Sequence, residues 1–295
     1  MICIYHRMDA DGWSSASIVK RWHDQKNDGT ELKLIGYQYK EPVPYDLIPA
    51  GEPIIMVDVC LDSMEDMLKL AKHSNNQMTW IDHHASSIKD YKEFIQEHGE
   101  FLTAVLKDGI SACEGTWNYL FPDTKMPLAI QLLGEYDTWR NQDKHRWDNV
   151  ILPFQFGMRL YCTSAETFPV HLFEDVARDV DSIIKEGVTV LKYQGIVNKT
   201  QCSEASFEMN FEGLRAICVN VGLFNSDVFK SVYDESKHDI MIPFQFNGKS
   251  WRVSLYSTKP EIDCSVIAKK YKGGGHKQAS GMELTDISTI FPMIK

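Results

Sequence analysis

The sequence of 295 residues lacks any long apolar run and any excess of positive charge. Its longest uninterrupted apolar stretches, such as Ile54-Ile55-Met56-Val57, are far too short to cross a bilayer. Lys and Arg number 31 against 41 Asp and Glu, and the formal net charge of −10 argues against a protein that coats long nucleic acid. The first residues also lack a basic stretch followed by an apolar one, which excludes a typical signal peptide. We therefore expect a cytoplasmic protein with no membrane association.

Cysteine occurs without the spacing that a structural role requires. The cysteines are odd in number and never form a C-x-x-C pair: Cys3, Cys60, Cys113, Cys162, Cys202, Cys218 and Cys264. This pattern argues against a disulfide framework and against a thiolate zinc site. We expect these residues to be buried, reduced thiols.

The first half of the chain alternates short apolar runs with helical patterns. Strand-like runs cover residues 2–5, 32–37, 53–59 and 78–81, and helical patterns cover residues 13–22 and 63–72. Such alternation predicts an α/β domain with a parallel sheet. From residue 111 onward the pattern becomes helical, most clearly over residues 111–120 and 128–136, which predicts a helical cap on the sheet.

The second half predicts a helical linker followed by a smaller α+β domain. Between residues 168 and 200, apolar residues recur at spacings near three and four, which predicts one or two helices. The segments beyond are strand-like at 208–211, 215–219, 240–246 and 250–256 and helical at 227–234. Asn247-Gly248 predicts a hairpin, and a last helix is predicted from an Asp263 cap to Gly273. The expected boundaries are 1–170, 171–203 and 204–295.

Three groups of acidic residues and histidines directly follow strand-like runs. In chain order they are His6 with Asp9-x-Asp11-Gly12, then Asp58, and then Asp82-His83-His84. Each group alone is typical of a turn, a helix cap or a structural histidine pair. Because the carboxyl ends of parallel strands meet at one edge of a sheet, the three groups together predict a single crevice and a metal site.

The donor types indicate which metal ions fit. Carboxylates and imidazoles without cysteine suit a hard divalent ion such as Mn²⁺ or Mg²⁺, or a zinc site built from oxygen and nitrogen. So many carboxylates in one crevice would repel one another unless cations neutralised them. Two ions that share a bridging carboxylate are an arrangement that splits phosphate esters.

A glycine run near the end of the chain is a further candidate for binding. Gly273-Gly274-Gly275 precedes His276-Lys277 and the small residues Ala279-Ser280-Gly281. Alone, a glycine run after a helix is typical of a cap and a loop. Here it also lets backbone N–H groups approach an anion, with His276 and Lys277 as additional donors.

The ordered set of motifs, from His6 to Gly281, resembles the DHH phosphoesterase superfamily with its DHH-associated C-terminal domain, and in particular its nanoRNase-like oligoribonucleases. The resemblance implies an N-terminal DHH domain with a parallel sheet, a helical linker and a smaller α+β domain. It also implies two Mn²⁺ ions in the first domain, with Mg²⁺ or another divalent ion as the alternative.

The resemblance further implies a role for individual residues. One ion would be held by His6, Asp9 and Asp58, and the other by Asp11, Asp58, His83 and Asp137, with Asp58 bridging. Asp137 is the best match to the fourth family motif, and Asp123, Asp143 and Asp148 are nearby alternatives. The implied catalytic residues are Asp58, Asp82 and His84. The implied substrate-binding residues are His84, Gly274, Gly275, His276, Lys277 and Ser280.

The predicted activity is hydrolysis of short oligonucleotides to mononucleotides by a water that two metal ions activate. Cyclic or linear dinucleotides, 3′-phosphoadenosine 5′-phosphate and single-strand DNA ends are alternative substrates, and a nucleotide-binding module without turnover is the non-enzymatic alternative. We expect no stable complex with long nucleic acid, and the oligomeric state, a homodimer included, stays open. Trp13, Trp139 and Tyr256 lie near the proposed site, where each is a candidate for stacking on a base.

Overall fold

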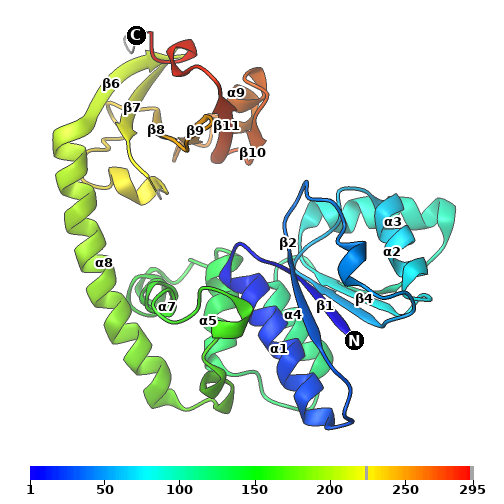
Figure 1. Cartoon of the computed structure of the whole chain (residues 1–295). Coiled ribbons are helices and arrows are strands. Elements are labelled where there is room, and N and C mark those ends of the chain that lie inside the picture. Colours follow the sequence, from blue (N-terminus) through cyan, green and yellow to red (C-terminus); the bar gives the residue numbers. More distant parts are fainter. Residues whose placement is uncertain (223–224, 293–295) are drawn as a thin grey trace. The chain divides into compact units, whose positions relative to one another are not determined.

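The computed structural model describes residues 1–222 and 225–292 (Figure 1). The chain forms two compact units, Met1–Leu191 and Lys192–Lys295. The division falls within α8 (Ala177–Ala205), a single helix of 29 residues. The sequence-based boundaries after residues 170 and 203 stay a prediction.

The first unit is built on a parallel five-stranded sheet, as predicted. Its strands lie in the order β2-β1-β3-β4-β5. They are β1 (Ile2–His6), β2 (Lys33–Tyr37), β3 (Ile54–Val57), β4 (Met78–Asp82) and β5 (Thr103–Leu106). The strand order reverses between β1 and β3, so the carboxyl ends of these two strands flank the point where open α/β sheets bind ligands.

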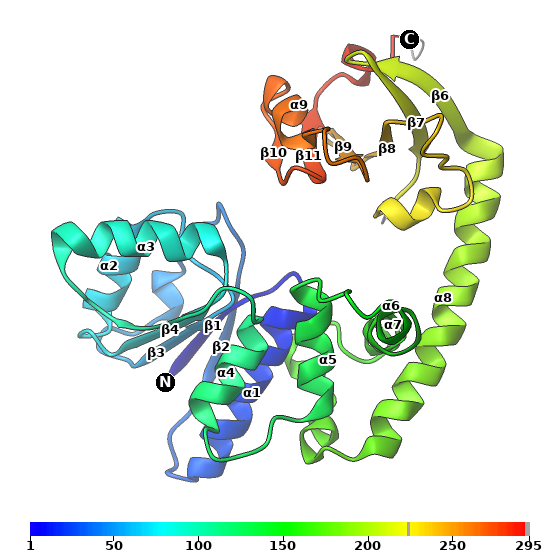
Figure 2. The same ribbon diagram turned by 180° about the vertical axis from the view of Figure 1, so that it is seen from behind.

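Helices cover both faces of this sheet (Figure 2). One face carries α1 (Ala10–Lys26), α4 (Ala112–Leu120) and α5 (Leu128–Asp137), and the other α2 (Met64–His73) and α3 (Ala85–His98). Within β1, Cys3 and Tyr5 pack into one core while Ile2 and Ile4 pack into the other. Burial on both sides explains why β3 is apolar throughout and why β1 is apolar up to His6.

The predicted helical cap is a succession of short helices. Beyond α4 and α5, which confirm its two clearest predicted helices, it comprises α6 (Lys144–Arg146), a π-helical turn (Trp147–Ile151) and α7 (Leu152–Met158). Single 3₁₀ turns lie at Tyr45–Leu47, Ala165–Thr167 and Val170–Glu174. The sequence patterns missed α3 and β5, which lie between the DHH motif and the first predicted helix of the cap.

The second unit contains a six-stranded mixed sheet in the order β10-β11-β9-β8-β7-β6. The strands are β6 (Ser206–Phe211), β7 (Leu214–Asn220), β8 (Ile240–Phe246), β9 (Trp251–Tyr256), β10 (Gly274–Gly275) and β11 (Ala279–Leu284). The predicted hairpin between β8 and β9 is confirmed, and Asp263 caps α9 (Cys264–Lys270) as expected. A last 3₁₀ turn covers Ile287–Thr289.

One predicted helix in this unit is wrong. Residues 227–234 contribute only to a 3₁₀ turn, Ser226–Phe229, followed by further turns. The side chain of Asp234 accepts hydrogen bonds from the backbone N–H of Ser236 and from its hydroxyl. Such local bonds stabilise a turn in place of a helix.

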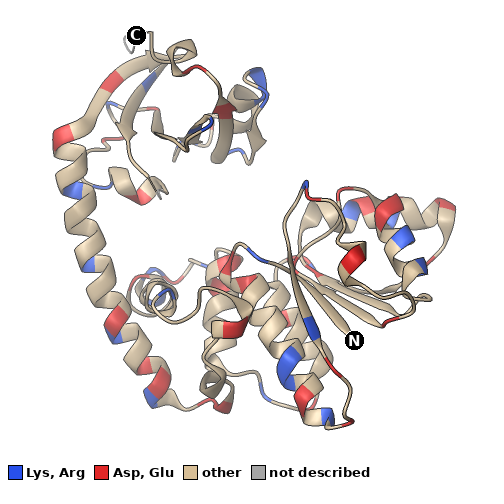
Figure 3. Cartoon of the chain, in the orientation of Figure 1, with Lys and Arg blue, Asp and Glu red and all other residues tan. Residues whose placement is uncertain are grey.

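All seven cysteines are free and buried, as predicted. Within the described residues, no helix combines the length and apolar character needed to cross a membrane. Basic residues are interspersed with acidic ones along both units (Figure 3). The cytoplasmic location stays a prediction.

Candidate metal centre and active site

The first acidic motif is held against the end of β1 by a helix that begins immediately after it. Asp9 caps α1, and its Oδ1 accepts a hydrogen bond of 3.0 Å from the backbone N–H of Gly12. A Cβ atom at position 12 would overlap the carbonyl oxygen of His6. Only glycine therefore allows α1 to start so close to the strand, and this brings Asp9 and Asp11 beside His6.

Asp58 occupies the centre of the site. It has a φ of 59° and its side chain is 2% exposed, an uncommon conformation for a residue other than glycine. Its backbone N–H donates to the carbonyl of Ile81 over 3.0 Å, which holds the end of β3 against β4. Its Oδ2 lies 3.5 Å from His6 Nδ1, and its Oδ1 lies 3.4 Å from His83 Nε2. The two carboxylate oxygens thus face two different histidines.

Three groups of donors lie at this edge of the sheet, and two of them are made of ligands that the resemblance implies. The third joins Asp58 and His83 to Asp82 and His84. The first group is His6, Asp9 and Asp58, in which His6 Nδ1 lies 2.8 Å from Asp9 Oδ2. In the second group, His83 Nε2 lies 3.6 Å from Asp11 Oδ2 and 3.4 Å from Asp137 Oδ2. Among the described residues, the donor groups include none of the alternatives Asp123, Asp143 and Asp148. The assignment of these residues as metal ligands stays a prediction.

The donors fit a divalent cation. Asp58 Oδ2 and Asp82 Oδ2 are buried and make no hydrogen bond, and His6 Nδ1 is buried beside the carboxylates of Asp9 and Asp58. Buried polar atoms without partners are costly and therefore rare in folded proteins. A cation bound by these oxygen and nitrogen atoms would satisfy them, and the donor types suit Mn²⁺, Mg²⁺ or zinc.

The crowding of carboxylates shifts their pKa values. Burial and the neighbouring Asp11 raise the pKa of Asp137 to about 8, and the same two causes raise the pKa of Asp58 well above its usual range. Burial disfavours protonation of His6, but Asp58 and Asp9 outweigh it and raise the pKa of His6 to about 10. Without metal ions, protons on these residues therefore balance the negative charge that bound cations would otherwise neutralise.

In the third motif, Asp82-His83-His84, the two histidines have different surroundings. Asp82 Oδ1 accepts from the backbone N–H groups of His83 and His84, over 2.7 and 3.2 Å, and lies 2.7 Å from His84 Nδ1. His84 directly precedes α3, and its side chain is 38% exposed. His83 therefore faces the donor groups, whereas His84 is oriented by Asp82 at the edge of the site.

Comparison with known proteins finds two relatives by sequence. No family model matches the chain. The chain is 26% identical to an uncharacterized protein of Acanthamoeba polyphaga mimivirus, over 100% of this chain and 70% of that protein. It is 25% identical to Oligoribonuclease NrnB of Bacillus subtilis (strain 168), over 75% of this chain and 56% of NrnB. The alignment thus spans little more than half the length of NrnB.

A solved structure shows the same fold. It is described as the DHH domain of a member of the s1p family of ribosomal proteins, and it superposes with a TM-score of 0.60 and 16% identity. The match covers 96% of this chain and 82% of that one. The chain therefore has the fold of that DHH-domain structure, and its similarity to NrnB is consistent with a DHH-type phosphoesterase.

Two contacts in the first unit could not be predicted from the sequence. His6 Nε2 lies 3.0 Å from Gln38 Oε1, so Nε2 carries the proton and Nδ1 is left free to bind a metal ion. Asp11 accepts hydrogen bonds of 2.8 Å from the backbone N–H groups of Ala112 and Cys113, at the start of α4. This pairing ties α1 to the positive end of α4.

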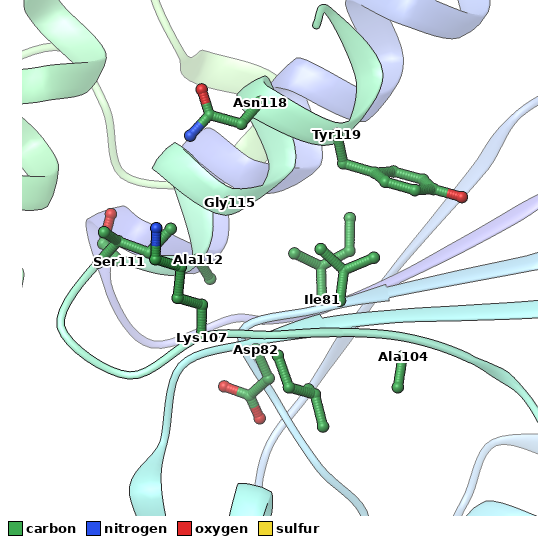
Figure 4. Close-up of a pocket in the computed structure, with 12 residues that line it drawn as sticks. Ile81, Asp82, Ala104, Lys107, Ser111, Ala112, Gly115, Asn118 and Tyr119 are labelled. Atoms are coloured by element: carbon green, nitrogen blue, oxygen red, sulfur yellow. The ribbon is translucent and has the colours of Figure 1, made fainter. Parts of the chain in front are cut away.

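A cavity of about 480 Å³ lies in the first unit between β5 and α4 (Figure 4). Ile81 and Ala104 lie on the sheet side, and Tyr119 of α4 extends above them. Asp82 and Lys107 lie at one end of the cavity. It therefore adjoins the residue that orients His84.

In the second unit, the glycine motif forms a tight hairpin and not an open loop. Gly274 and Gly275 form β10, which pairs with Gly281 and Ser280 of β11. His276 and Ala279 exchange backbone hydrogen bonds of 2.8 and 3.2 Å, so Lys277 and Gln278 form the turn. His276 and Lys277 are exposed, whereas Ser280 is buried and its hydroxyl donates to the His276 carbonyl over 2.7 Å. The substrate-binding roles of these residues stay predictions.

Proposed function

We propose that the chain is a metal-dependent phosphodiesterase that hydrolyses short oligonucleotides to mononucleotides. The observation that carries the proposal is the convergence of His6, His83 and the carboxylates around Asp58, with Asp58 Oδ2 and Asp82 Oδ2 buried and without a hydrogen bond. The relative NrnB is named an oligoribonuclease, which supports the substrate class. The net charge of −10 also favours short substrates over long polyanions.

The donor groups support a proposed set of metal ligands. His6, Asp9 and Asp58 would hold one divalent ion, with Mn²⁺ as the preferred ion. Asp11, His83 and Asp137 would hold the second, and Asp58 offers one oxygen to each group. When bound, the ions would supply Lewis-acid activation of water and neutralise charge on the phosphate.

His84 is the side chain that we expect to contact the phosphate. Asp82 lies 2.7 Å from Nδ1 of His84, so it accepts the Nδ1 proton and orients the ring. The partly exposed His84 ring can then donate a hydrogen bond from Nε2 to an equatorial phosphate oxygen. Fixed donors of this kind stabilise the charge that develops in the transition state. The glycine hairpin is proposed to bind the rest of the substrate.

The test is hydrolysis, with Mn²⁺ and then with Mg²⁺, of a diribonucleotide, a five-residue RNA, a single-strand DNA, a cyclic dinucleotide, 3′-phosphoadenosine 5′-phosphate and pyrophosphate. We expect mononucleotides from the shortest RNAs, resolved by chromatography. Turnover of pyrophosphate alone, or no turnover with Mn²⁺ shown to be bound, would contradict the proposal.

Asp58→Asn provides the variant for this test. It removes the charge between the two histidines, and we expect turnover to fall by at least about 10³-fold, since metal ligands act as a unit in such centres. Asp286→Asn is the matched control, because Asp286 caps the 3₁₀ turn Ile287–Thr289 through a hydrogen bond of 2.9 Å from Ser288 that asparagine can also accept. Equal activity of the two variants would remove Asp58 from the centre.

A further inference from the structure

Trp139 lies close in sequence to the predicted ligand Asp137 and has a backbone conformation that bulky residues rarely adopt. It follows Asp137 by two residues, so their Cα atoms lie no more than about 7 Å apart. Its φ is 56°, in the left-handed region that bulky residues rarely adopt. The side chain is nevertheless 62% exposed, which is unusual for the largest apolar side chain. Asparagine or glycine would serve the turn better, so the indole itself requires a reason.

The backbone on both sides of Trp139 is fixed. Before it, the Thr138 hydroxyl donates to the carbonyl of Gly134 over 2.7 Å. After it, the Arg140 backbone N–H donates to the carbonyl of Glu135 over 2.9 Å, and the Arg140 guanidinium lies 2.6 Å from Glu114 Oε2. Glu114 in turn belongs to the capping box of α4, whose first residues bind Asp11. The turn is therefore tied to the same helix end as one of the predicted ligands.

The ring is supported on one side by a buried aromatic residue. Trp147 is 4% exposed, and its ring meets that of Trp139 edge to face at a centroid distance of 4.9 Å. This contact restrains the indole but leaves most of its surface open. The other two candidates for base stacking are less available. Trp13 donates a hydrogen bond from Nε1 to the Arg7 carbonyl over 2.8 Å, and Tyr256 is only partly exposed.

We propose that Trp139 is a stacking platform for the nucleobase next to the scissile phosphate, and that it makes the site selective for base-bearing phosphodiesters over base-free phosphoesters. This inference rests on the proposed function. A nucleobase lies one ribose away from its phosphate, which is comparable to the separation of at most about 7 Å between the Cα atoms of Asp137 and Trp139. A rigid, pre-positioned indole binds a base at little entropic cost, and stacking tolerates every base.

The experiment compares two substrates that differ only in their bases: diadenylate and the same ribose–phosphate–ribose backbone without bases. We expect Trp139→Ala to lower the ratio of kcat/KM for diadenylate to kcat/KM for the base-free substrate by about 5- to 150-fold, mainly through KM. Trp139→Phe should restore most of the ratio, because a phenyl ring also stacks. An equal loss on both substrates would overturn the inference, since it would indicate that Trp139 only positions Asp137.

Phe246→Ala is the matched control. Phe246 is 53% exposed and packs on Trp251 at 5.3 Å, at the opposite end of β9 from the glycine hairpin. We expect the ratio of the two kcat/KM values in Phe246→Ala to equal that of the wild type. A second readout is calorimetric binding of diadenosine with an uncleavable methylphosphonate linkage, which should weaken at least fivefold in Trp139→Ala. If the wild type cleaves neither substrate, the proposed hydrolysis fails, and this binding measurement alone decides the inference.

Discussion

The nitrogen that His6 offers to the centre is decided by a residue outside every sequence motif. Gln38 accepts from Nε2 of His6, which leaves Nδ1 pointing to Asp9 and Asp58. Partners that orient a ligand in this way typically change metal affinity by 10- to 100-fold. Gln38 is thus a positioning residue for the predicted ligand His6.

We expect Gln38→Leu to weaken Mn²⁺ binding by about 10- to 100-fold, because the His6 ring loses the acceptor that fixes its tautomer. The measurement is the electron paramagnetic resonance signal of free Mn²⁺ during a titration. Gln38→Glu keeps an acceptor oxygen and should bind Mn²⁺ nearly as well as the wild type. Identical affinities of Gln38→Leu and the wild type would show that Gln38 does not act through His6.

A second prediction for a single residue concerns His276. Its ring is exposed at the end of the glycine hairpin, and the implied role is substrate binding. We expect His276→Ala to raise KM for a dinucleotide with a smaller change in kcat, since the residue is not among the metal donors. The comparison variant is Gln278→Ala in the same turn. An unchanged KM in His276→Ala would remove His276 from the site.

At the scale of elements, the apolar pattern alone was sufficient to predict β1 to β4, α1, α2, α4, α5 and the hairpin of β8 and β9. It failed where the local sequence carries two signals. The glycines of residues 273–275 end a helix, but two of them also form β10, and only pairing with β11 decides that outcome. A Cβ at Gly273 would overlap the carbonyl oxygen of Gly281, so the close approach of the two segments requires glycine.

The approach of α7 to α8 gives a prediction with a control in the same helix. A Cβ atom at Gly187 of α8 would overlap the Pro153 carbonyl oxygen of α7, whereas a Cβ at Gly195 meets nothing within 4 Å. We expect Gly187→Ala to destabilise the protein by about 1–3 kcal/mol through overpacking. Gly195→Ala should stabilise it by about 0.5–1 kcal/mol, because alanine is the better helix former. The measurement is thermal unfolding, and shifts of the same sign would contradict this packing.

At the scale of the whole molecule, the centre makes stability depend on metal and pH. Burial and Asp11 raise the pKa of Asp137 to about 8, above its value of 3.8 in an unfolded chain. Between these two pH values the folded state binds more protons than the unfolded state, so this group makes stability fall as pH rises. A divalent cation replaces the protons and stabilises the folded state by about 2.7 kcal/mol at a concentration of 100 Kd.

We therefore expect Mn²⁺ to raise the Tm more at pH 8 than at pH 6. In the metal-free protein, Asp137→Asn should flatten the decline in Tm between these pH values, because the titrating group is removed. Differential scanning fluorimetry with and without a chelator measures both effects, and Asp286→Asn serves as the control. A larger Mn²⁺ effect at pH 6 would contradict the crowded-carboxylate interpretation.

The sequence by itself determined the parallel sheet and predicted buried, free cysteines and a set of candidate donors, because strand periodicity and residue chemistry are local properties. It also predicted Asp137 among four nearby aspartates, and the structure places Asp137 next to His83. Only the tertiary structure decided that Asp58 faces both histidines, that Gln38 fixes His6 and that Asp11 joins α1 to α4. These contacts join residues 25 to 102 positions apart, so no pattern within a short window encodes them. The same holds for the ring of Trp139, whose exposure follows from packing against Trp147 and from a turn anchored on α4.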